Sequence, residues 1–142
     1  MTKQAGCELC ELNALVAWQG GKFSVIIVDD ANYPGFCRVI WNEHVREMSD
    51  LAQDDRLLLN EAVYRLELAV REAMQPLKVN VASLGNVVPH LHWHVIPRYA
   101  DDAHFPAPVW AQAARQTDAA TLAARRALLP QLAAAIARHF NE

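Results

Sequence analysis

Hydrophobic and polar residues alternate strictly over one short segment of the chain. Positions 90–97 read His-Leu-His-Trp-His-Val-Ile-Pro. Successive side chains of a strand point to opposite faces, so this pattern predicts a strand whose three histidines, His90, His92 and His94, share one face. The apolar residues between them share the other face, which we expect to pack against a hydrophobic core.

Two further hydrophobic runs predict a β-hairpin earlier in the chain. They cover residues 23–28 and 36–41 and are rich in β-branched and aromatic residues. Residues 29–35 between them contain Asp, Asn, Pro and Gly, which favour turns. Residues 78–83 are predicted to form another strand, and residues 84–89 a turn that leads into the histidine strand.

Helical spacing of hydrophobic residues predicts one long amphipathic helix between Ser49, a suitable N-cap, and Pro76, which ends it. The alanine-rich stretch 117–141 is also predicted to be helical, with Pro130 in the first turn of a new helix. Strands therefore precede and follow a single central helix. This order favours an α+β fold, in which an antiparallel sheet packs against the long helix and a helical segment follows at the C-terminus.

Length and composition indicate one small globular domain spanning residues 1–142. The chain is 53% hydrophobic and 20% charged, as is ordinary for such a domain. Its net charge of −3, without blocks of like charge, argues against a nucleic acid polymer as a partner. No segment approaches the roughly 18 apolar residues that cross a membrane, and the N-terminus carries no apolar signal segment. We therefore expect a soluble cytoplasmic protein without membrane association.

The histidine face permits two kinds of chemistry. Imidazole is the commonest zinc ligand, and three histidines suit a catalytic zinc that keeps one open position. Alternatively, the middle histidine is itself a nucleophile that attacks phosphorus, while its neighbours fix its tautomer and donate protons. The pattern of residues alone leaves both open.

Motifs across residues 7–110 resemble those of the histidine triad, or HIT, superfamily. The alternating histidines continue into Ile96-Pro97-Arg98 and follow a turn at Gly85-Asn86, as in that family. The segment from Pro34 to His44 is similar to another family stretch, and residues 104–110 resemble the tail of bacterial members described as diadenosine tetraphosphate hydrolase-like. The resemblance implies a HIT-like α+β fold, a homodimer and nucleotide chemistry.

By this resemblance, the three triad histidines form the catalytic set. His92 would attack the α-phosphorus of a nucleotide while a backbone carbonyl holds its other ring nitrogen, and His94 and Asn86 would donate to phosphate oxygens. Many family members carry a serine or threonine where this chain has Val87, which cannot donate a hydrogen bond. We therefore expect another donor, a slower enzyme or a different substrate.

The pair Cys7 and Cys10 predicts a second site. Two thiolates at this spacing can bind a tetrahedral zinc, and the resemblance implies that His44 and His90 supply the remaining ligands. Such a closed zinc site would be structural and would withdraw His90 from catalysis. An unmetallated cysteine pair remains an alternative, and no organic cofactor is expected.

Residues that bind the nucleoside are harder to assign. Asp29 lies where the family uses an acidic residue to bind ribose hydroxyls, and Asp30 is an alternative one residue away. Trp110 is expected either to stack on the base or to pack in a structural role. Arg98 is expected to be solvated and to lie outside the site.

The resulting expectation is a hydrolase that cleaves dinucleoside polyphosphates or nucleoside phosphoramidates at the α-phosphate, through a nucleotidyl-histidine. A nucleotidyltransferase and a nucleotide-binding adaptor with little turnover are the alternatives, as is a zinc enzyme that uses the triad as its metal site.

Overall fold

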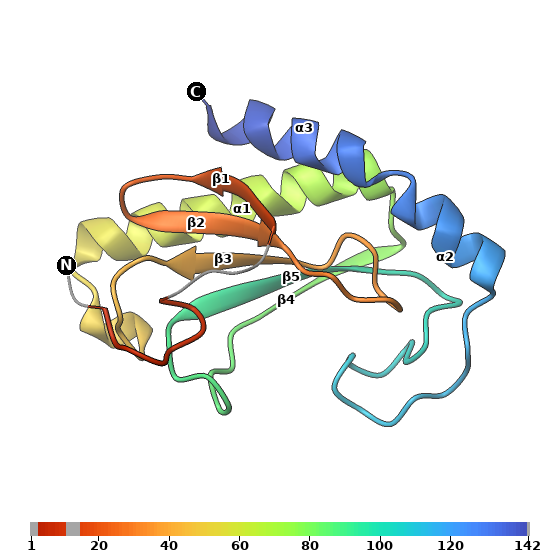
Figure 1. Cartoon of the computed structure of the whole chain (residues 1–142), viewed down its shortest axis with the longest axis horizontal. Coiled ribbons are helices and arrows are strands. Elements are labelled where there is room, and N and C mark those ends of the chain that lie inside the picture. The colour runs from red at the N-terminus through yellow and green to blue at the C-terminus, as the bar shows by residue number, and fades with distance from the viewer. Residues whose placement is uncertain (1–2, 11–14, 142) are drawn as a thin grey trace.

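A computed structural model describes residues 3–10 and 15–141 of the chain, which form one sheet with helices on one side of it (Figure 1). The described elements, in chain order, are β1 (Leu15–Gln19), β2 (Phe23–Ile27), β3 (Cys37–Trp41), a 3-10 turn η1 (Met48–Asp50), α1 (Gln53–Met74), β4 (Lys78–Ala82), β5 (His92–Arg98), α2 (Ala119–Arg126) and α3 (Leu129–Phe140).

The five strands form one sheet in the order β1-β2-β3-β5-β4, and every neighbouring pair is antiparallel. The predicted α+β fold and the hairpin of β2 and β3 are therefore confirmed. Sequence analysis did not predict β1. As an edge strand it pairs on one side only, and its Leu15 and Val16 are exposed, so it lacks the buried hydrophobic run that marks β2.

The long helix α1 packs on one face of the sheet. Its buried side chains include Leu59, Leu66 and Val70, which share a core with Val39 of β3 and Val95 of β5. Burying side chains of this size contributes roughly 1.5 to 3 kcal/mol each, so this layer is the main source of stability. The helix ends at the expected place, because Gln75 adopts a left-handed conformation directly before Pro76.

The start of α1 was predicted wrongly. Ser49 lies inside η1, where the Asp50 carboxylate accepts a hydrogen bond from the Glu47 N–H at 3.0 Å. Leu51 then returns to an extended conformation, and α1 begins at Gln53. A short turn with its own acidic cap therefore precedes the helix, and the periodicity of the hydrophobic residues could not separate the two.

The C-terminal stretch forms α2 and α3, with Pro130 in the first turn of α3 as predicted. Phe140 of α3 packs against the rings of Trp18 and Phe23. The helices α1 and α3 thus lie on the same side of the sheet in Figure 1. The opposite face carries the cluster of Leu9, Ile26 and Ile40, and loops and the N-terminal segment lie over it.

Candidate active site and metal centre

His92 and His94 lie side by side on the sheet face that the helices leave open. Their ring centroids are 4.9 Å apart, and the rings are nearly perpendicular. Trp93 and Val95, which alternate with them, contact the core beneath α1. Strand alternation therefore places the two imidazoles together, as the sequence pattern predicts.

These two histidines line a pocket of about 420 Å³. Its lining also includes Glu8 and Leu9 of the N-terminal segment, residues 84–88 of the turn before β5, and Trp110. The pocket is large enough for part of a nucleotide, and both histidine rings reach it although each residue is at most 6% exposed.

The His92 ring has a defined tautomer. Its Nδ1 lies 2.5 Å from the backbone carbonyl oxygen of His90, and a carbonyl can only accept a hydrogen bond. Nδ1 must therefore carry the proton, which leaves the lone pair on Nε2. Burial lowers the pKa of His92, and the nearby Arg38 lowers it further, so the neutral ring is favoured. A neutral imidazole with a free nitrogen is the form that acts as a nucleophile.

His94 has the opposite tautomer. Arg38 donates its Nε–H to Nδ1 of His94 at 3.4 Å, so the proton of the neutral ring resides on Nε2. Burial, His92 and Arg38 together lower the pKa of His94 to about 4. Phe36 and Trp110 pack against the ring, with centroids 5.6 and 5.1 Å away. His94 is therefore a fixed, neutral hydrogen-bond donor at neutral pH.

His90 lies before β5 begins, and its ring is directed away from the pocket. Its Nδ1 lies 3.5 Å from the Cys7 sulfur, 3.4 Å from the Cys10 sulfur and 3.2 Å from Nδ1 of His44. Its Nε2 lies 2.5 Å from the carbonyl oxygen of Trp41, which fixes the ring orientation. The histidine pattern therefore divides between two sites, two residues in the pocket and one in this cluster.

All four residues predicted to bind metal lie in this cluster, namely Cys7, Cys10, His44 and His90. Their ligand atoms are all within 4.8 Å of one another. Zinc bonds of 2.0 to 2.3 Å in a tetrahedron separate ligand atoms by about 3.5 Å, and four pairs of these atoms lie 3.2 to 3.5 Å apart. Two thiols and two imidazoles are a typical donor set for a closed structural zinc site. The residues therefore fit zinc.

The triad does not form a metal site in the described part of the chain. Within residues 3–10 and 15–141, the cysteine and histidine cluster is the one group of three or more metal-binding side chains close enough to share an ion. His92 and His94 are not members of it. This geometry argues against a zinc enzyme that uses the triad as its metal ligands.

The predicted nucleoside-binding residues fall into two groups. Asn86 and Trp110 line the pocket, and Trp110 is half exposed. Asp29 follows β2, is exposed and does not line the pocket, and Asp30 caps the turn by accepting hydrogen bonds from two backbone N–H groups. A role for Asp29 in ribose binding stays a prediction.

Sequence analysis missed Arg38, which lines the pocket from β3 directly opposite His94. Arg38 is the single charged residue in the otherwise apolar run 36–41, and a charge in a buried strand is unusual, so this position already indicated a functional residue. Arg98, expected to be solvated, is instead 1% exposed at the end of β5. It pairs with Asp102 through two hydrogen bonds of 2.8 and 3.0 Å.

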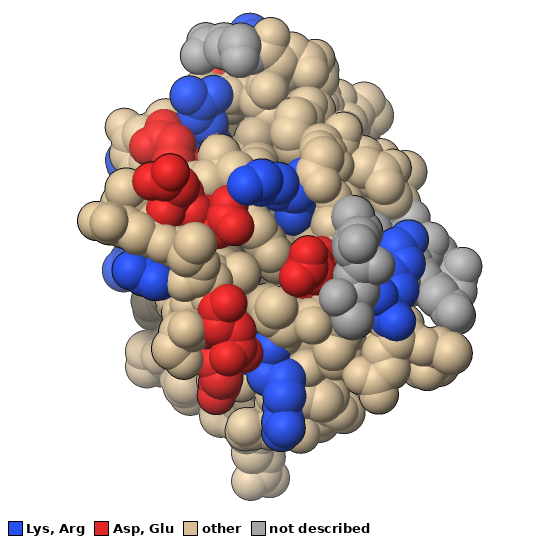
Figure 2. Space-filling view, turned by 90° about the vertical axis from the view of Figure 1, so that its left-hand side faces the viewer, with Lys and Arg blue, Asp and Glu red and all other residues tan. Residues whose placement is uncertain are grey.

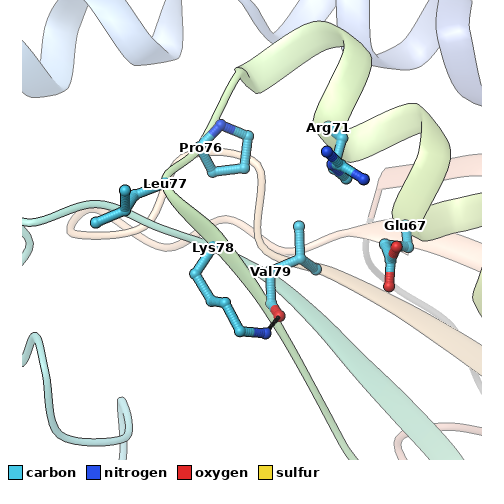
Figure 3. A pocket seen from close by; sticks show the side chains of 6 residues that line it. All are labelled: Glu67, Arg71, Pro76, Leu77, Lys78 and Val79. Atoms are coloured by element: carbon cyan, nitrogen blue, oxygen red, sulfur yellow. Dashed lines mark hydrogen bonds between the residues drawn. The ribbon is translucent and has the colours of Figure 1, made fainter.

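Other surfaces of the molecule carry less chemistry. A hollow of about 250 Å³ lies between the last turns of α1 and the start of β4 (Figure 3), and its lining includes Glu67, Arg71 and Lys78 but no histidine or cysteine of the described chain. On the face drawn in Figure 2, acidic and basic side chains are interspersed. The histidine pocket is therefore the candidate active site.

No helix in the described part of the chain is both long and apolar enough to cross a membrane. Among curated proteins, no sequence matches the chain.

Solved structures of histidine triad proteins resemble this chain over nearly its whole length. One from Bradyrhizobium japonicum is 27% identical with a TM-score of 0.75, and the match covers 98% of both chains. One from Marinobacter aquaeolei is 26% identical with a TM-score of 0.72, covering 96% of this chain and 99% of the other. A Zn-bound histidine triad family protein from Mycobacterium smegmatis shares the fold, with 19% identity, a TM-score of 0.67 and 94% of each chain covered.

The model of the HIT domain matches residues 11–101, which contain β1 to β5, the long helix and all three histidines of the alternating pattern. This chain therefore belongs to the HIT domain family.

Proposed function

We propose that this protein is a nucleotide hydrolase that cleaves the bond between a nucleoside α-phosphate and its leaving group. The observation that carries the proposal is the tautomer of His92. The carbonyl of His90 holds the proton on Nδ1, and the free Nε2 belongs to a ring that lines a pocket. This arrangement prepares an imidazole for attack on phosphorus without a separate base.

The reaction would proceed in two steps. Nε2 of His92 forms a bond to the α-phosphorus while the bond to the leaving group breaks with its electron pair, giving a nucleotidyl-histidine. Nε2–H of His94 donates to a phosphate oxygen and stabilises charge as the transition state forms. Water then forms a bond to the phosphorus and loses a proton to solvent, while the bond from phosphorus to Nε2 breaks with its electron pair, which releases the nucleoside monophosphate and restores free His92.

Substrates with a phosphate leaving group fit the pocket best. Val87 is 93% exposed and carries no hydroxyl, so its side chain cannot protonate a departing group. A polyphosphate departs as a stable anion, whereas the amine of a phosphoramidate needs a proton. We therefore favour dinucleoside polyphosphates such as diadenosine tetraphosphate, in line with the likeness of residues 104–110 to the tail of hydrolase-like bacterial relatives.

We also propose a structural zinc bound by Cys7, Cys10, His44 and His90. Supporting this proposal are the mutual distances of the four ligand atoms and the zinc in the Mycobacterium smegmatis relative. When bound, zinc would tie the N-terminal segment to the sheet. His90 would then be held at its ring, while its backbone carbonyl orients His92.

A nucleotidyltransferase is the second candidate, because the same nucleotidyl-histidine could pass its nucleotide to an acceptor other than water. The half-exposed Trp110 in the pocket lining is the observation that favours it, since an acceptor with an aromatic ring could stack on it. An adaptor that binds nucleotides without turnover would keep the pocket and lose the chemistry.

The test is release of AMP from diadenosine tetraphosphate and from adenosine phosphoramidate by wild type and His92→Ala, with and without a chelator. Turnover that is lost in the variant and survives brief chelation is the expected result. Trapping of a radiolabelled adenylyl group on wild type but not on the variant would identify the intermediate. Tight AMP binding without any turnover or trapped adduct would instead favour the adaptor.

A further inference from the structure

Arg38 lines the candidate active site from β3, and the mechanism above uses only its Nε–H, which fixes the tautomer of His94. It lies opposite His94 in the sheet, and its guanidinium is held near the two pocket histidines by the hydrogen bond to His94. The same cation packs over the Phe36 ring, with 5.8 Å between the guanidinium carbon and the ring centroid. Both contacts direct the side chain along the open face toward the reacting centre.

The terminal nitrogens of this guanidinium are not used within the protein. Among residues 3–10 and 15–141, Arg38 forms no ion pair, and its Nε is the one nitrogen with a hydrogen-bond partner. Glu8 and Asp30 are the carboxylates whose charges act on Arg38, and neither forms a salt bridge with it. A guanidinium stays charged even when half buried, so the N–H groups of its two terminal nitrogens lie in the lining of the pocket without an anion of the described chain to receive them.

A half-buried cation without a paired anion is unfavourable in the free protein and becomes favourable once an anion occupies the site. Phosphate oxygens match the terminal N–H groups of a guanidinium, which can donate two parallel hydrogen bonds. Arg38 is the one lysine or arginine among the described residues that line this pocket, and Glu8 is the one acidic residue among them.

We propose that Arg38 is a substrate-binding residue that takes a phosphate oxygen of the nucleotide held at His92 and His94. In the empty pocket, the negative charge of Glu8 partly balances the charge of Arg38, and it therefore opposes the binding of an anion. The inference rests on the proposed function for the identity of the ligand, but it concerns binding and requires no turnover.

The test compares the affinity of AMP with that of adenosine by calorimetric titration. Arg38→Gln removes the charge and keeps a polar side chain, so AMP should bind about 10- to 100-fold more weakly while adenosine binds as to wild type. Glu8→Gln should strengthen AMP binding and leave adenosine unchanged. Arg126→Gln, on the exposed surface of α2, is the matched control and should change neither affinity.

Thermal unfolding of each variant shows whether it is folded. Arg38→Lys should bind AMP more tightly than Arg38→Gln but more weakly than wild type, because lysine restores the charge but not the two parallel hydrogen bonds of a guanidinium. Equal loss of AMP and adenosine binding in Arg38→Gln would overturn the proposal, because Arg38 would then contact the nucleoside. Wild type that binds AMP no more tightly than adenosine would also overturn it. Wild type that binds AMP through Arg38 but hydrolyses nothing would refute the hydrolase and leave this inference intact.

Discussion

His94 links the charge state of the pocket to the stability of the protein. Its pKa falls from an ordinary value of 6.5 to about 4 in the folded chain, chiefly because the ring is buried. Below pH 6.5 the unfolded chain binds a proton that the folded chain does not accept until about pH 4. The free energy of unfolding should therefore fall as pH drops through this range, by up to roughly 3 kcal/mol at 1.4 kcal/mol per unit.

Urea unfolding of wild type and His94→Gln at pH 7 and pH 4.5 measures this contribution. Glutamine does not titrate, so the variant should lose less stability between the two values than wild type does. The same pH dependence in both proteins would show that His94 is not the group responsible.

The buried ion pair of Arg98 and Asp102 is a second single-residue determinant of stability. Burial alone would raise the pKa of Asp102, but Arg98 and the backbone N–H groups of Tyr99, His104 and Phe105 lower it to about 2. Asp102→Asn removes the charge and leaves Arg98 buried without a counter-ion. We expect a loss of about 3 to 5 kcal/mol in the free energy of unfolding.

The neighbouring residue provides the control for this measurement. Asp101 pairs with Arg125 and is more than half exposed at its side chain, so Asp101→Asn should cost at most about 1 kcal/mol. Denaturant unfolding of both variants at pH 7 gives the comparison. Similar losses in the free energy of unfolding for the two variants would show that the buried pair contributes no more to stability than the exposed one.

Individual residues were predictable where a motif carried them. The four candidate metal ligands followed from spacing and resemblance, and the structure brings those four together, while His92 as nucleophile stays a prediction. The burial of Arg98 was not predictable in the same way, because it depends on the ion pair with Asp102 in the loop after β5. Arg38 required knowledge of which strand pairs with β5.

At the level of elements, the loop between β2 and β3 packs so closely against the end of α1 that a residue larger than glycine is not accommodated at Gly35 without a shift of its neighbours. Gly35 has a φ of 92°, and a Cβ there would lie 3.0 Å from the Cε and Cγ atoms of Met74, at the end of α1. Gly35→Ala should therefore cost about 1 to 3 kcal/mol, through backbone strain and displacement of the methionine.

Gly21 offers a matched control in the turn before β2, since a Cβ at that position would meet no atom within 4 Å. Gly21→Ala is expected to change the free energy of unfolding by less than about 1 kcal/mol. Chemical denaturation of the two variants measures the difference. A neutral Gly35→Ala would show that the loop and Met74 shift without cost.

Elements with strong periodicity were predictable, and those shaped by their neighbours were not. The hairpin, β4 and the C-terminal helices followed from local patterns. The boundary between η1 and α1 depends on a side-chain cap, and β1 depends on pairing with β2 alone. β5 begins later than predicted, because the backbone N–H groups of His90 and Leu91 donate to the carbonyl oxygens of Val88 and Val45, outside the sheet.

For the whole molecule, the cysteine and histidine cluster brings the N-terminal segment against His90, which lies 80 positions beyond Cys10 and 83 beyond Cys7. Zinc that binds only the folded chain would stabilise it by mass action, by about 2.7 kcal/mol at a free concentration one hundred times the dissociation constant. Zinc should therefore raise the Tm of wild type and bind in a one-to-one ratio.

Cys10→Ser should abolish both the rise in Tm and the stoichiometric zinc, because oxygen is a poorer ligand than thiolate at such a site. Cys37→Ser serves as a control, since Cys37 is buried among hydrophobic residues away from the cluster. Metal analysis and thermal unfolding give both readouts. Equal zinc content in wild type and Cys10→Ser would contradict the assignment.

The expected homodimer also belongs to this scale. β4 is an edge strand, and Leu77, Val81, Leu84 and Trp110 are exposed on or beside it. An unpaired edge with apolar side chains favours association with a second copy. Light scattering should give twice the chain mass of 15.9 kDa for wild type, and the mass of one chain for Val81→Lys. Monomeric wild type at micromolar concentration would remove this expectation.

The two ends of the described chain lie on opposite faces of the sheet. The N-terminal segment borders both the cysteine cluster and the pocket, whereas α3 packs on α1 and β1, on the side of the sheet that carries the helices (Figure 1). A polyhistidine tag at the N-terminus would therefore bring six foreign imidazoles to the very place where metal content and nucleotide affinity are measured. Purification through a C-terminal tag keeps both measurements specific to the protein's own ligands.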